Sequence, residues 1–352
     1  MRKIYLIRHG QPELPGGERI CLGSSELPLS TLGRLQACLL GLELGGRVSA
    51  VFSSPLSRAR DTALALAPRV RVLPGLMEQY AGDWEGLSFE LIRRRWPELY
   101  RARGENMELP MPGAEEAGAA LERFRAALDT ALGSSTGDIA VVAHRSVNRL
   151  FLGSIAPDLP ARNLYQSCGA WSELYYDGTF RPGRLNVLPR PSLDRDACLA
   201  LLEAAGLPEN VREHCKAAAQ LALEIAAELE SAGVETRRQL IESAALLHDI
   251  ARLSPDHAAL GARWLEVLGY GAQAEIIRQH HECPAQPPEA ALVSLADKCL
   301  SGARRVGLEE RFRLSFSKCI DEQARQAHAR RKAAALALRE KINSICGKEV
   351  VP

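Results

Sequence analysis

Several features that would assign a chain to a common class are missing from this sequence. Its 44 Lys and Arg residues are balanced by 43 Asp and Glu residues, so the basic surface of a nucleic-acid-binding domain is not expected. No apolar run reaches the ~18 residues of a membrane-spanning helix. Met1-Arg2-Lys3 leads into a short apolar strand without the small-residue cleavage site of a signal peptide. These absences predict a cytoplasmic protein that binds neither nucleic acid nor membrane.

Cysteine is scattered rather than paired. The chain has nine cysteines, an odd number, and no two of them form a CxxC pair. In a cytoplasmic chain of this length we expect reduced thiols, mostly in the core, and neither a disulfide framework nor a zinc knuckle.

Histidine is scarce and clustered. Only eight are present: two in the first half, at 9 and 144, and five between 214 and 281. A single histidine is more often an ordinary surface or core residue than a functional one. Histidines gathered near Arg, Asp and Glu are, however, the groups that catalytic and metal sites require.

The first half alternates short apolar runs with helical patterns. This alternation predicts a layered sheet with helices on both faces. Ser54-Pro55 predicts a helix start, with Ser as the N-cap and Pro at the first position. We predict strands at 4–7, 50–52, 70–73, 139–142 and 171–176, and helices at 29–44, 55–67, 89–100 and 115–132.

The pattern changes at the Pro-rich segment 188–191, beyond which helical patterns dominate. Ser254-Pro255-Asp256 predicts a further helix start. The predicted helices are 211–232, 236–253, 258–268, 272–281, 288–302 and 321–346. We predict domains at 1–188 and 197–310, a linker at 189–196, and a helical extension at 311–352. The basic, Ala-rich helix of this extension would pack on the second domain or on another subunit in a homodimer, with His328 on the surface.

Five charged or imidazole side chains follow four predicted strands of the first half. Arg8-His9-Gly10 follows the first strand, Arg58 lies in the first turn after the second, Glu78 follows the third, and His144 ends a later one. The carboxyl ends of parallel strands meet at one sheet edge, so these groups would converge on one pocket. Together they provide a nucleophile, a cationic clamp for phosphate and a general acid.

This ordered set resembles the histidine phosphatase superfamily over residues 1 to about 188. The resemblance implies the phosphoglycerate mutase-like fold, an α/β three-layer sandwich. It implies that His9 is the nucleophile that becomes phosphohistidine and that Glu78 is the proton donor. Arg8, Arg58 and His144 would form the phosphate pocket, without a cofactor. The domain's length resembles the small phosphatase branch, whose members hydrolyse small phosphomonoesters.

Two positions depart from the family pattern. Arg145 stands where a glycine usually follows the second histidine, and Gln11-Pro12 replaces the usual acidic residue and threonine. Arg145 would either narrow the pocket or contact an anionic part of the substrate.

A second group of metal-binding residue types lies on apolar helices of the second half. His214 shares a helix face with Leu221 and Ile225, and the pair His248-Asp249 interrupts an apolar stretch. Asp297 does the same on a later helix. A carboxylate buried on such a face needs a cation or several hydrogen bonds. These nitrogen and oxygen ligands suit Fe, Mn, Mg or Zn.

This set resembles the HD phosphohydrolase superfamily, an all-α helical bundle, over about 193–310. The resemblance implies that His214, His248, Asp249 and Asp297 are metal ligands. It also implies that His257 and His280 match a branch that holds two divalent ions, Fe, Mn or Mg. Such members cleave phosphoester or phosphoanhydride bonds of nucleotide-like substrates. Of the remaining residues, Lys298 is expected on an exposed helix face, and Cys283 is an unusual sulfur candidate. His281 is either an outer partner of the site or a surface residue.

The two resemblances predict a bifunctional phosphohydrolase. One domain would hydrolyse a small phosphomonoester through phosphohistidine, and the other would use metal to hydrolyse a phosphoester or phosphoanhydride. The alternative is that only one domain is catalytic and that the other is a regulatory ligand-binding module.

Overall fold

The chain divides into two compact units, Met1–Pro191 and Ser192–Pro352. The computed structural model describes residues 1–351 apart from 107, 285–287 and 318. The division lies at the Pro-rich connection between the sheet-forming and helical parts of the sequence.

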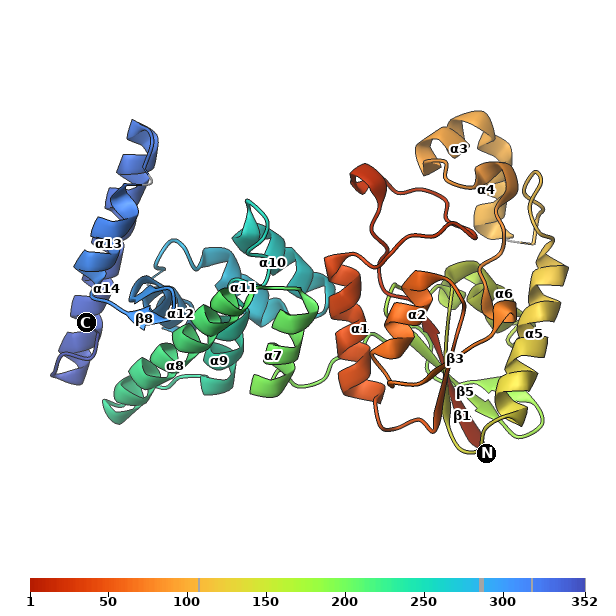
Figure 1. Ribbon diagram of the computed structural model, residues 1–352, viewed down its shortest axis with the longest axis horizontal. Helices are drawn as coiled ribbons and strands as arrows, with labels where there is room; N and C mark the ends of the chain where they lie inside the picture. The colour runs from red at the N-terminus through yellow and green to blue at the C-terminus, as the bar shows by residue number, and fades with distance from the viewer. Residues whose placement is uncertain (107, 285–287, 318, 352) are drawn as a thin grey trace. The chain divides into compact units, whose positions relative to one another are not determined.

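The first unit is built on a six-stranded sheet with the order β3-β2-β4-β1-β5-β6 (Figure 1). Strands β3, β2, β4 and β1 run parallel to one another. Strands β5 and β6 are added at the β1 edge, and each is antiparallel to the strand before it in the sheet. The strands are β1 (Arg2–Arg8), β2 (Ala50–Ser53), β3 (Val70–Val72), β4 (Ile139–Ala143), β5 (Trp171–Tyr176) and β6 (Phe180–Pro182).

Both faces of this sheet are covered by helices. Ile4 and Leu6 of β1 pack in one apolar cluster with α5 (Ala117–Gly133) and α6 (Arg145–Ile155). Alternate residues of the same strand pack in another cluster with α1 (Thr31–Leu44) and α2 (Ser57–Leu64). Because side chains alternate across a strand, one continuous apolar run serves both faces. The predicted three-layer α/β sandwich is confirmed.

The predicted helix 89–100 is two helices, α3 (Phe89–Arg95) and α4 (Pro97–Glu105). Proline lacks a backbone N–H and disfavours helical geometry in the residue before it, so Trp96 leaves the helix with φ −132°. The two helices pack around the buried Trp84 in a small apolar cluster of their own.

Three central strands end at the same level, so the polar side chains that follow them lie at one edge of the sheet. Arg8 pairs with Ala143, and Ser53 pairs with Val142. The segments that follow β1, β2 and β4 therefore begin side by side. The predicted start of α2 was wrong: the helix begins at Ser57, and Ser54 lies in the preceding turn.

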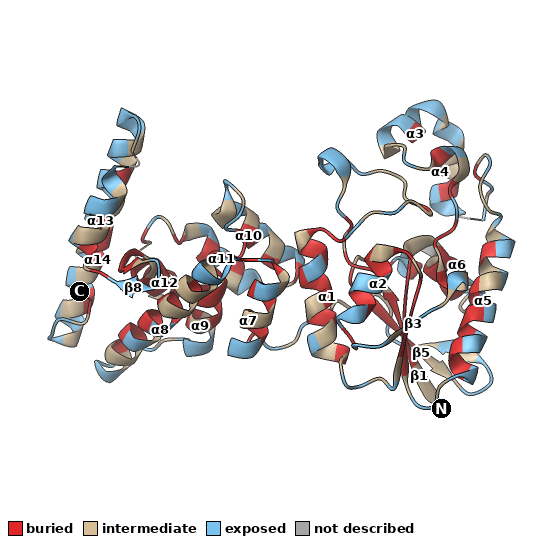
Figure 2. Cartoon of the chain, viewed as in Figure 1, coloured by how far each residue is buried: buried red, intermediate tan, exposed pale blue. Residues whose placement is uncertain are grey.

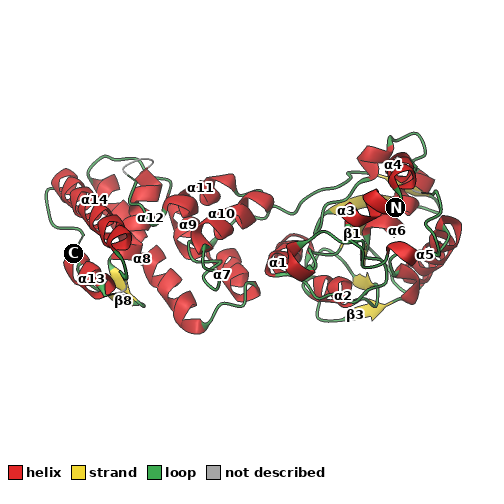
Figure 3. Cartoon of the chain, turned by 90° about the horizontal axis from the view of Figure 1, so that it is seen from above, coloured by secondary structure: helices red, strands yellow, loops and turns green. Residues whose placement is uncertain are grey.

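The second unit is helical, apart from a short hairpin (Figure 3). The buried residues of this unit lie mainly on α8, α9 and α12, and almost every residue of α12 is buried (Figure 2). The helices are α7 (Arg195–Ala204), α8 (Glu209–Ser231), α9 (Arg238–Leu247), α10 (His257–Val267), α11 (Gly271–Gln279), α12 (Pro288–Lys298), α13 (Leu308–Phe316) and α14 (Glu322–Cys346). The predicted all-α bundle is confirmed.

Three local predictions for this unit were wrong. The helix predicted at 236–253 ends at Leu247, so His248 and Asp249 lie in the turns after it. The segment after α12 forms a hairpin of β7 (Leu300–Ser301) and β8 (Arg304–Arg305). His328 is buried, because its ring packs between Phe312 and Phe316.

Within the described residues, no helix combines the length and the apolar character needed to cross a membrane.

The loop after β1 rests directly on the first turn of α1, and two glycines make this approach possible. A Cβ on Gly33 would lie 2.1 Å from the carbonyl oxygen of Gln11, and one on Gly10 would lie 2.4 Å from that of Gly33. Both obstacles are backbone atoms, which cannot rotate away.

We expect Gly33→Ala to lower the free energy of unfolding of the first unit by about 1–3 kcal/mol, the usual cost of overpacking. Urea denaturation of the full chain, followed by a probe in this unit, measures the change. The control is Gly118→Ala in α5, where a Cβ meets no atom within 4 Å. That exposed helical substitution should stabilise by about 0.5–1 kcal/mol. Equal stability of Gly33→Ala and wild type would show that the loop can withdraw.

Candidate active site and candidate metal centre

His9 directly follows β1 and is 5% exposed. Its Nδ1 lies 2.6 Å from the carbonyl oxygen of Gly10. This contact requires Nδ1 to carry the hydrogen, which leaves the lone pair on Nε2. Arg58 points its Nε at that nitrogen from 3.3 Å. The nitrogen that faces the cationic side chain is thus the one that carries the lone pair.

Arg58 is fully buried in the first turn of α2. Its two terminal nitrogens donate hydrogen bonds to the carbonyl oxygens of Ser25, at 2.6 Å, and Gly23, at 2.9 Å. The guanidinium therefore joins the loop at residues 23–25 to the predicted nucleophile.

His144 follows β4, and its ring centre lies 5.0 Å from that of His9. Its Nε2 lies 2.7 Å from the hydroxyl oxygen of Ser54, while its Nδ1 is buried without a hydrogen-bond partner. Arg8 also keeps a buried Nε without a partner, although its Nη1 donates to the carbonyl oxygen of Gln166 at 2.7 Å. Buried polar atoms normally find partners, so these unpaired nitrogens indicate a place for an oxygen-rich ligand.

Glu78 lies across the start of α6. Its carboxylate oxygens accept backbone N–H groups of Ser146 at 2.9 Å, Val147 at 3.1 Å and Gln79 at 2.9 Å. Arg123 donates to the carbonyl oxygens of the preceding loop and of Glu78 itself. The structure thus brings all five predicted residues of the first site to one edge of the sheet.

Two supporting residues, Arg123 and Gln166, were missed from the sequence. The side chains of both donate to backbone carbonyl groups of distant segments, Gly75 for Arg123 and Leu6 for Gln166, and such contacts leave no local pattern in a sequence.

Burial, followed by the positive charges of Arg58 and Arg8, holds the pKa of His9 well below its usual range. Burial also lowers the pKa of His144 strongly, with His9 and Arg58 adding to the effect. Both rings are therefore neutral at pH 7. A neutral His9 keeps the lone pair that attack on phosphorus requires.

In the second unit, four predicted metal ligands meet between α8, α9 and α12. The Nε2 of His214 lies 3.1 Å from Asp297 Oδ1 and 3.3 Å from the Nε2 of His248. The Nδ1 atoms of both histidines bind backbone carbonyl oxygens, of Gly302 and Ala245, so both Nε2 atoms face inward. A carbonyl partner on the outer nitrogen is the usual arrangement of a metal-bound histidine.

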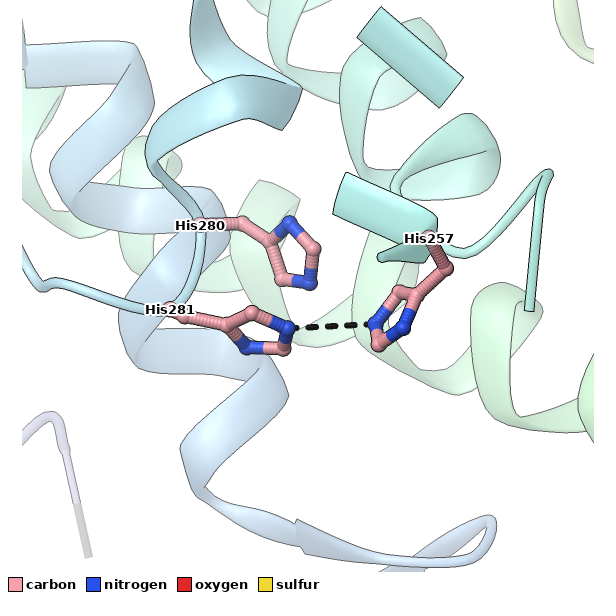
Figure 4. A group of neighbouring side chains, drawn as sticks. All are labelled: His257, His280 and His281. Atoms are coloured by element: carbon pink, nitrogen blue, oxygen red, sulfur yellow. Dashed lines mark hydrogen bonds between the residues drawn. The ribbon is translucent and has the colours of Figure 1, made fainter. Parts of the chain in front are cut away.

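A second cluster consists of His257, His280 and His281, whose rings turn toward one another (Figure 4). The Nε2 atoms of His257 and His281 lie 3.1 Å apart. The Nδ1 of His280 lies 2.7 Å from the carbonyl oxygen of Ile277, and its buried Nε2 has no partner. Figure 4 places His281, which the sequence left open, within this cluster.

Asp249 lies between the two clusters and turns one oxygen toward each. Its Oδ2 lies 3.7 Å from His248 Nε2 and 3.9 Å from His214 Nε2. Its Oδ1 lies 3.2 Å from His257 Nε2 and 4.0 Å from His280 Nε2. The six predicted ligands therefore form one continuous set, arranged around a carboxylate that is able to bridge two cations.

The charge state of this set suits a cation. Burial alone would raise the pKa of Asp297, but the hydrogen bond from His214 and the nearby His248 hold it well below its usual range. The pKa of Asp249 is also lowered, since His248 and His257 outweigh the effect of burial. Burial lowers the pKa of His281 to about 4. Burial alone would lower the pKa of His214, but its hydrogen bond to Asp297 and the charge of that carboxylate raise it. His214 therefore has to release a proton when it binds a divalent metal, whereas the carboxylates are already ionised.

The expectation that Lys298 is exposed was wrong. Its side chain is buried, and its Nζ donates to the carbonyl oxygen of His280 at 2.8 Å. Ser294 donates to the same oxygen, so α12 fixes the turn that carries the two adjacent histidines. The expectation failed because the partner oxygen comes from a segment 18 residues away.

Cys283 remains outside both clusters, and its backbone N–H donates to Ser294. All nine cysteines are free thiols; four are buried and five are partly buried.

Comparison with known families finds a match in each unit. Residues 4–181 match the family model of the histidine phosphatase superfamily (branch 1). The chain belongs to the histidine phosphatase superfamily. Residues 211–302 match the HD domain family model, so this member also carries an HD domain.

Several curated relatives and solved structures resemble the first unit. A protein of Mycobacterium tuberculosis named as bifunctional is 34% identical over 188 residues, 50% of this chain and 51% of that protein. The metal-independent phosphoserine phosphatase of Arabidopsis thaliana is 34% identical over 157 residues, 42% of this chain and 66% of the enzyme. The structure of mycobacterial glucosyl-3-phosphoglycerate phosphatase has 27% identity and a TM-score of 0.48, and it covers 53% of this chain and 99% of that one. The chain spans about half the length of the first of these curated relatives.

The buried histidines of this histidine phosphatase unit make its stability depend on pH. An unfolded histidine has a pKa near 6.5 and takes up a proton below that pH, whereas folded His144 does not. The unfolded state then binds more protons, so stability is full above pH 6.5 and falls as the pH decreases.

We expect His144 to account for a loss of about 1 kcal/mol between pH 7.5 and pH 5.5. Urea denaturation of wild type and His144→Gln at both pH values measures it, and the loss should be smaller in the variant. Ser54→Ala is the control, because it removes the hydroxyl partner of His144 but no titrating group. Equal losses in wild type and His144→Gln would contradict the assignment.

Proposed function

We propose that the protein is a bifunctional phosphohydrolase, with one hydrolytic site in each unit. The observation that carries the first activity is the lone pair of His9 Nε2, which faces Arg58 beside the unpaired nitrogens of His144 and Arg8. This arrangement supplies a nucleophile inside a pocket of cationic and neutral donors, as transfer of a phosphoryl group to histidine requires.

In the proposed reaction, His9 Nε2 attacks phosphorus, a P–N bond forms, and the bond between phosphorus and the ester oxygen breaks. Arg8, Arg58 and His144 hold the three remaining oxygens. Glu78 gives its proton to the departing oxygen. Water then attacks phosphorus, the P–N bond breaks, and Glu78 takes a proton back from the water. The substrate is a small phosphomonoester, and no metal takes part.

The second proposed activity is metal-dependent hydrolysis of a phosphoester or phosphoanhydride of a nucleotide-like substrate. His214, His248, Asp249 and Asp297 would hold one divalent ion, Fe, Mn or Mg. His257 and His280 would hold a second ion with the other oxygen of Asp249. Such an ion supplies a Lewis acid for the phosphate and lowers the pKa of water.

The residues of the chain prepare this centre in three ways. Asp249 and Asp297 provide negative charge at buried positions, and the outer carbonyl contacts orient the histidines. Arg252, whose Nη1 lies 3.1 Å from His257 Nε2, stands at the exposed rim, where it can meet a substrate phosphate.

His9→Ala should reduce phosphate release from phosphomonoesters at least about a thousandfold, because the variant has no nucleophile. A panel of phosphometabolites, assayed with a chelator present, measures this release. Acid-labile labelling of the wild type by a labelled substrate, absent in His9→Ala, provides a second readout. Release that survives in His9→Ala, or that requires added metal, would contradict the first activity.

Asp249→Asn should lose both bound Mn²⁺ and cleavage of dinucleoside polyphosphates, since the bridging negative charge is removed. Metal content after dialysis and chromatography of the products measure these losses. The matched control is Asp256→Asn, an exposed aspartate seven residues along the chain, which should behave as wild type. Metal binding without cleavage of any nucleotide in wild type would instead favour a regulatory role for the second unit.

A further inference from the structure

Arg145 is the first residue of α6 and lies between His144 and Ser146, both of which belong to the first site. A cation at a helix N-terminus meets the positive end of the helix dipole and is disfavoured there. Burial, followed by the charge of Arg8, lowers the pKa of Arg145. Its position is therefore unfavourable for a guanidinium unless an anion joins it.

The side chain of Arg145 is nevertheless held in a defined place. Its guanidinium carbon lies 5.1 Å from the centre of the Tyr165 ring, a cation–π distance. The next residue, Gln166, is locked in the core: its Oε1 accepts from Asn148 at 2.8 Å, and its Nε2 donates to the Leu6 carbonyl oxygen at 2.9 Å. This anchor fixes the backbone from which the Tyr165 ring projects.

The same dipeptide holds a second arginine. The carbonyl oxygen of Gln166 accepts from Arg8, which flanks the predicted nucleophile. Both Arg8 and Arg145 keep a buried Nε without a hydrogen-bond partner. The segment 165–166 therefore contacts the guanidinium groups of both arginines. Each guanidinium keeps an N–H group that is free to donate a hydrogen bond to a ligand.

The neighbouring carboxylate of Glu78 favours the charge of Arg145 but forms no ion pair with it. The oxygens of Glu78 are bound to three backbone N–H groups, one of them that of Ser146. Arg145 forms no ion pair with any residue in the described part of the chain. A phosphate at His9 would be met by Arg8 and Arg58, which leaves the charge of Arg145 for another group.

We propose that Arg145 binds a second anionic group of the substrate, a carboxylate or a phosphate, while the reacting phosphate lies at His9. The planar guanidinium offers two parallel donors that match either oxyanion. The first unit would thus select phosphomonoesters that carry a further negative charge. This inference rests on the proposed function of the same site.

The test measures binding in the His9→Ala background, where the ligand is not turned over, with a chelator present to empty the second unit. One ligand pair is phosphoserine and phosphoethanolamine, which differ by one carboxylate. The other is fructose 1,6-bisphosphate and fructose 6-phosphate, which differ by one phosphate. Isothermal titration gives the ratio of dissociation constants within each pair, and the two pairs distinguish the two sources of the oxyanion.

In at least one pair the doubly anionic ligand should bind about tenfold tighter or more, as expected for a charge-assisted hydrogen bond. Adding Arg145→Ala should bring that ratio to about one. Tyr165→Phe, which keeps the ring, should retain the preference, whereas Tyr165→Ala should weaken it. Arg47→Ala, at an exposed arginine outside the site, should leave the ratio unchanged.

Four results would overturn the inference: equal binding within both pairs, absence of binding by all four ligands, a preference that survives Arg145→Ala, or equal weakening of both members of a pair. The last would make Arg145 a further contact of the reacting phosphate. A preference that depends on Arg145, together with a wild type that releases no phosphate, would instead support the anion site and contradict the proposed chemistry.

Discussion

The burial of Arg58 is the interaction on which the geometry of the first site depends. A buried charge is costly unless its donors are satisfied, and all three guanidinium nitrogens of Arg58 have partners. Those partners lie on the loop at 23–25 and on His9, so satisfying the charge fixes both relative to α2. Burial lowers the pKa of Arg58, while Glu78 and Glu26 oppose that shift. The charge is therefore kept, and it in turn keeps His9 neutral.

The second unit buries negative charge, whereas the first buries the positive charge of Arg58. Asp249 and Asp297 place negative charge inside an apolar bundle. The surrounding histidines lie within 4 Å of these carboxylates and interact with that charge. Among the described residues, Arg252 is the only lysine or arginine that forms an ion pair with either carboxylate, and it approaches Asp249 from the exposed side. A cation held by these ligands would remove the remaining cost, which is why burial and metal affinity are linked here.

Much of this arrangement could be predicted from the sequence because its signals are local. Apolar runs such as 139–142 mark strands, and the residue after each strand must lie at the sheet edge. The failures share another cause. Ser54 looked like a helix cap, but its hydroxyl pairs with His144, which is 90 residues away. Lys298 was expected on an exposed face, but its Nζ donates a hydrogen bond to the carbonyl oxygen of His280. Long-range partners of single polar groups leave no periodic pattern.

The two sites also show how one chain can treat phosphate by two electrostatic strategies. The first pocket is cationic, with Arg8 and Arg58 beside neutral histidines, and therefore attracts an anion directly. The second contains two buried carboxylates and, in the proposed function, binds a cation before it attracts phosphate. In the proposed reaction the first pocket needs no metal, so its charge is set by side chains alone. Arg145 then has a larger effect on the charge of the pocket than a single arginine beside a metal ion would have, because the side chains alone set the charge that the substrate meets.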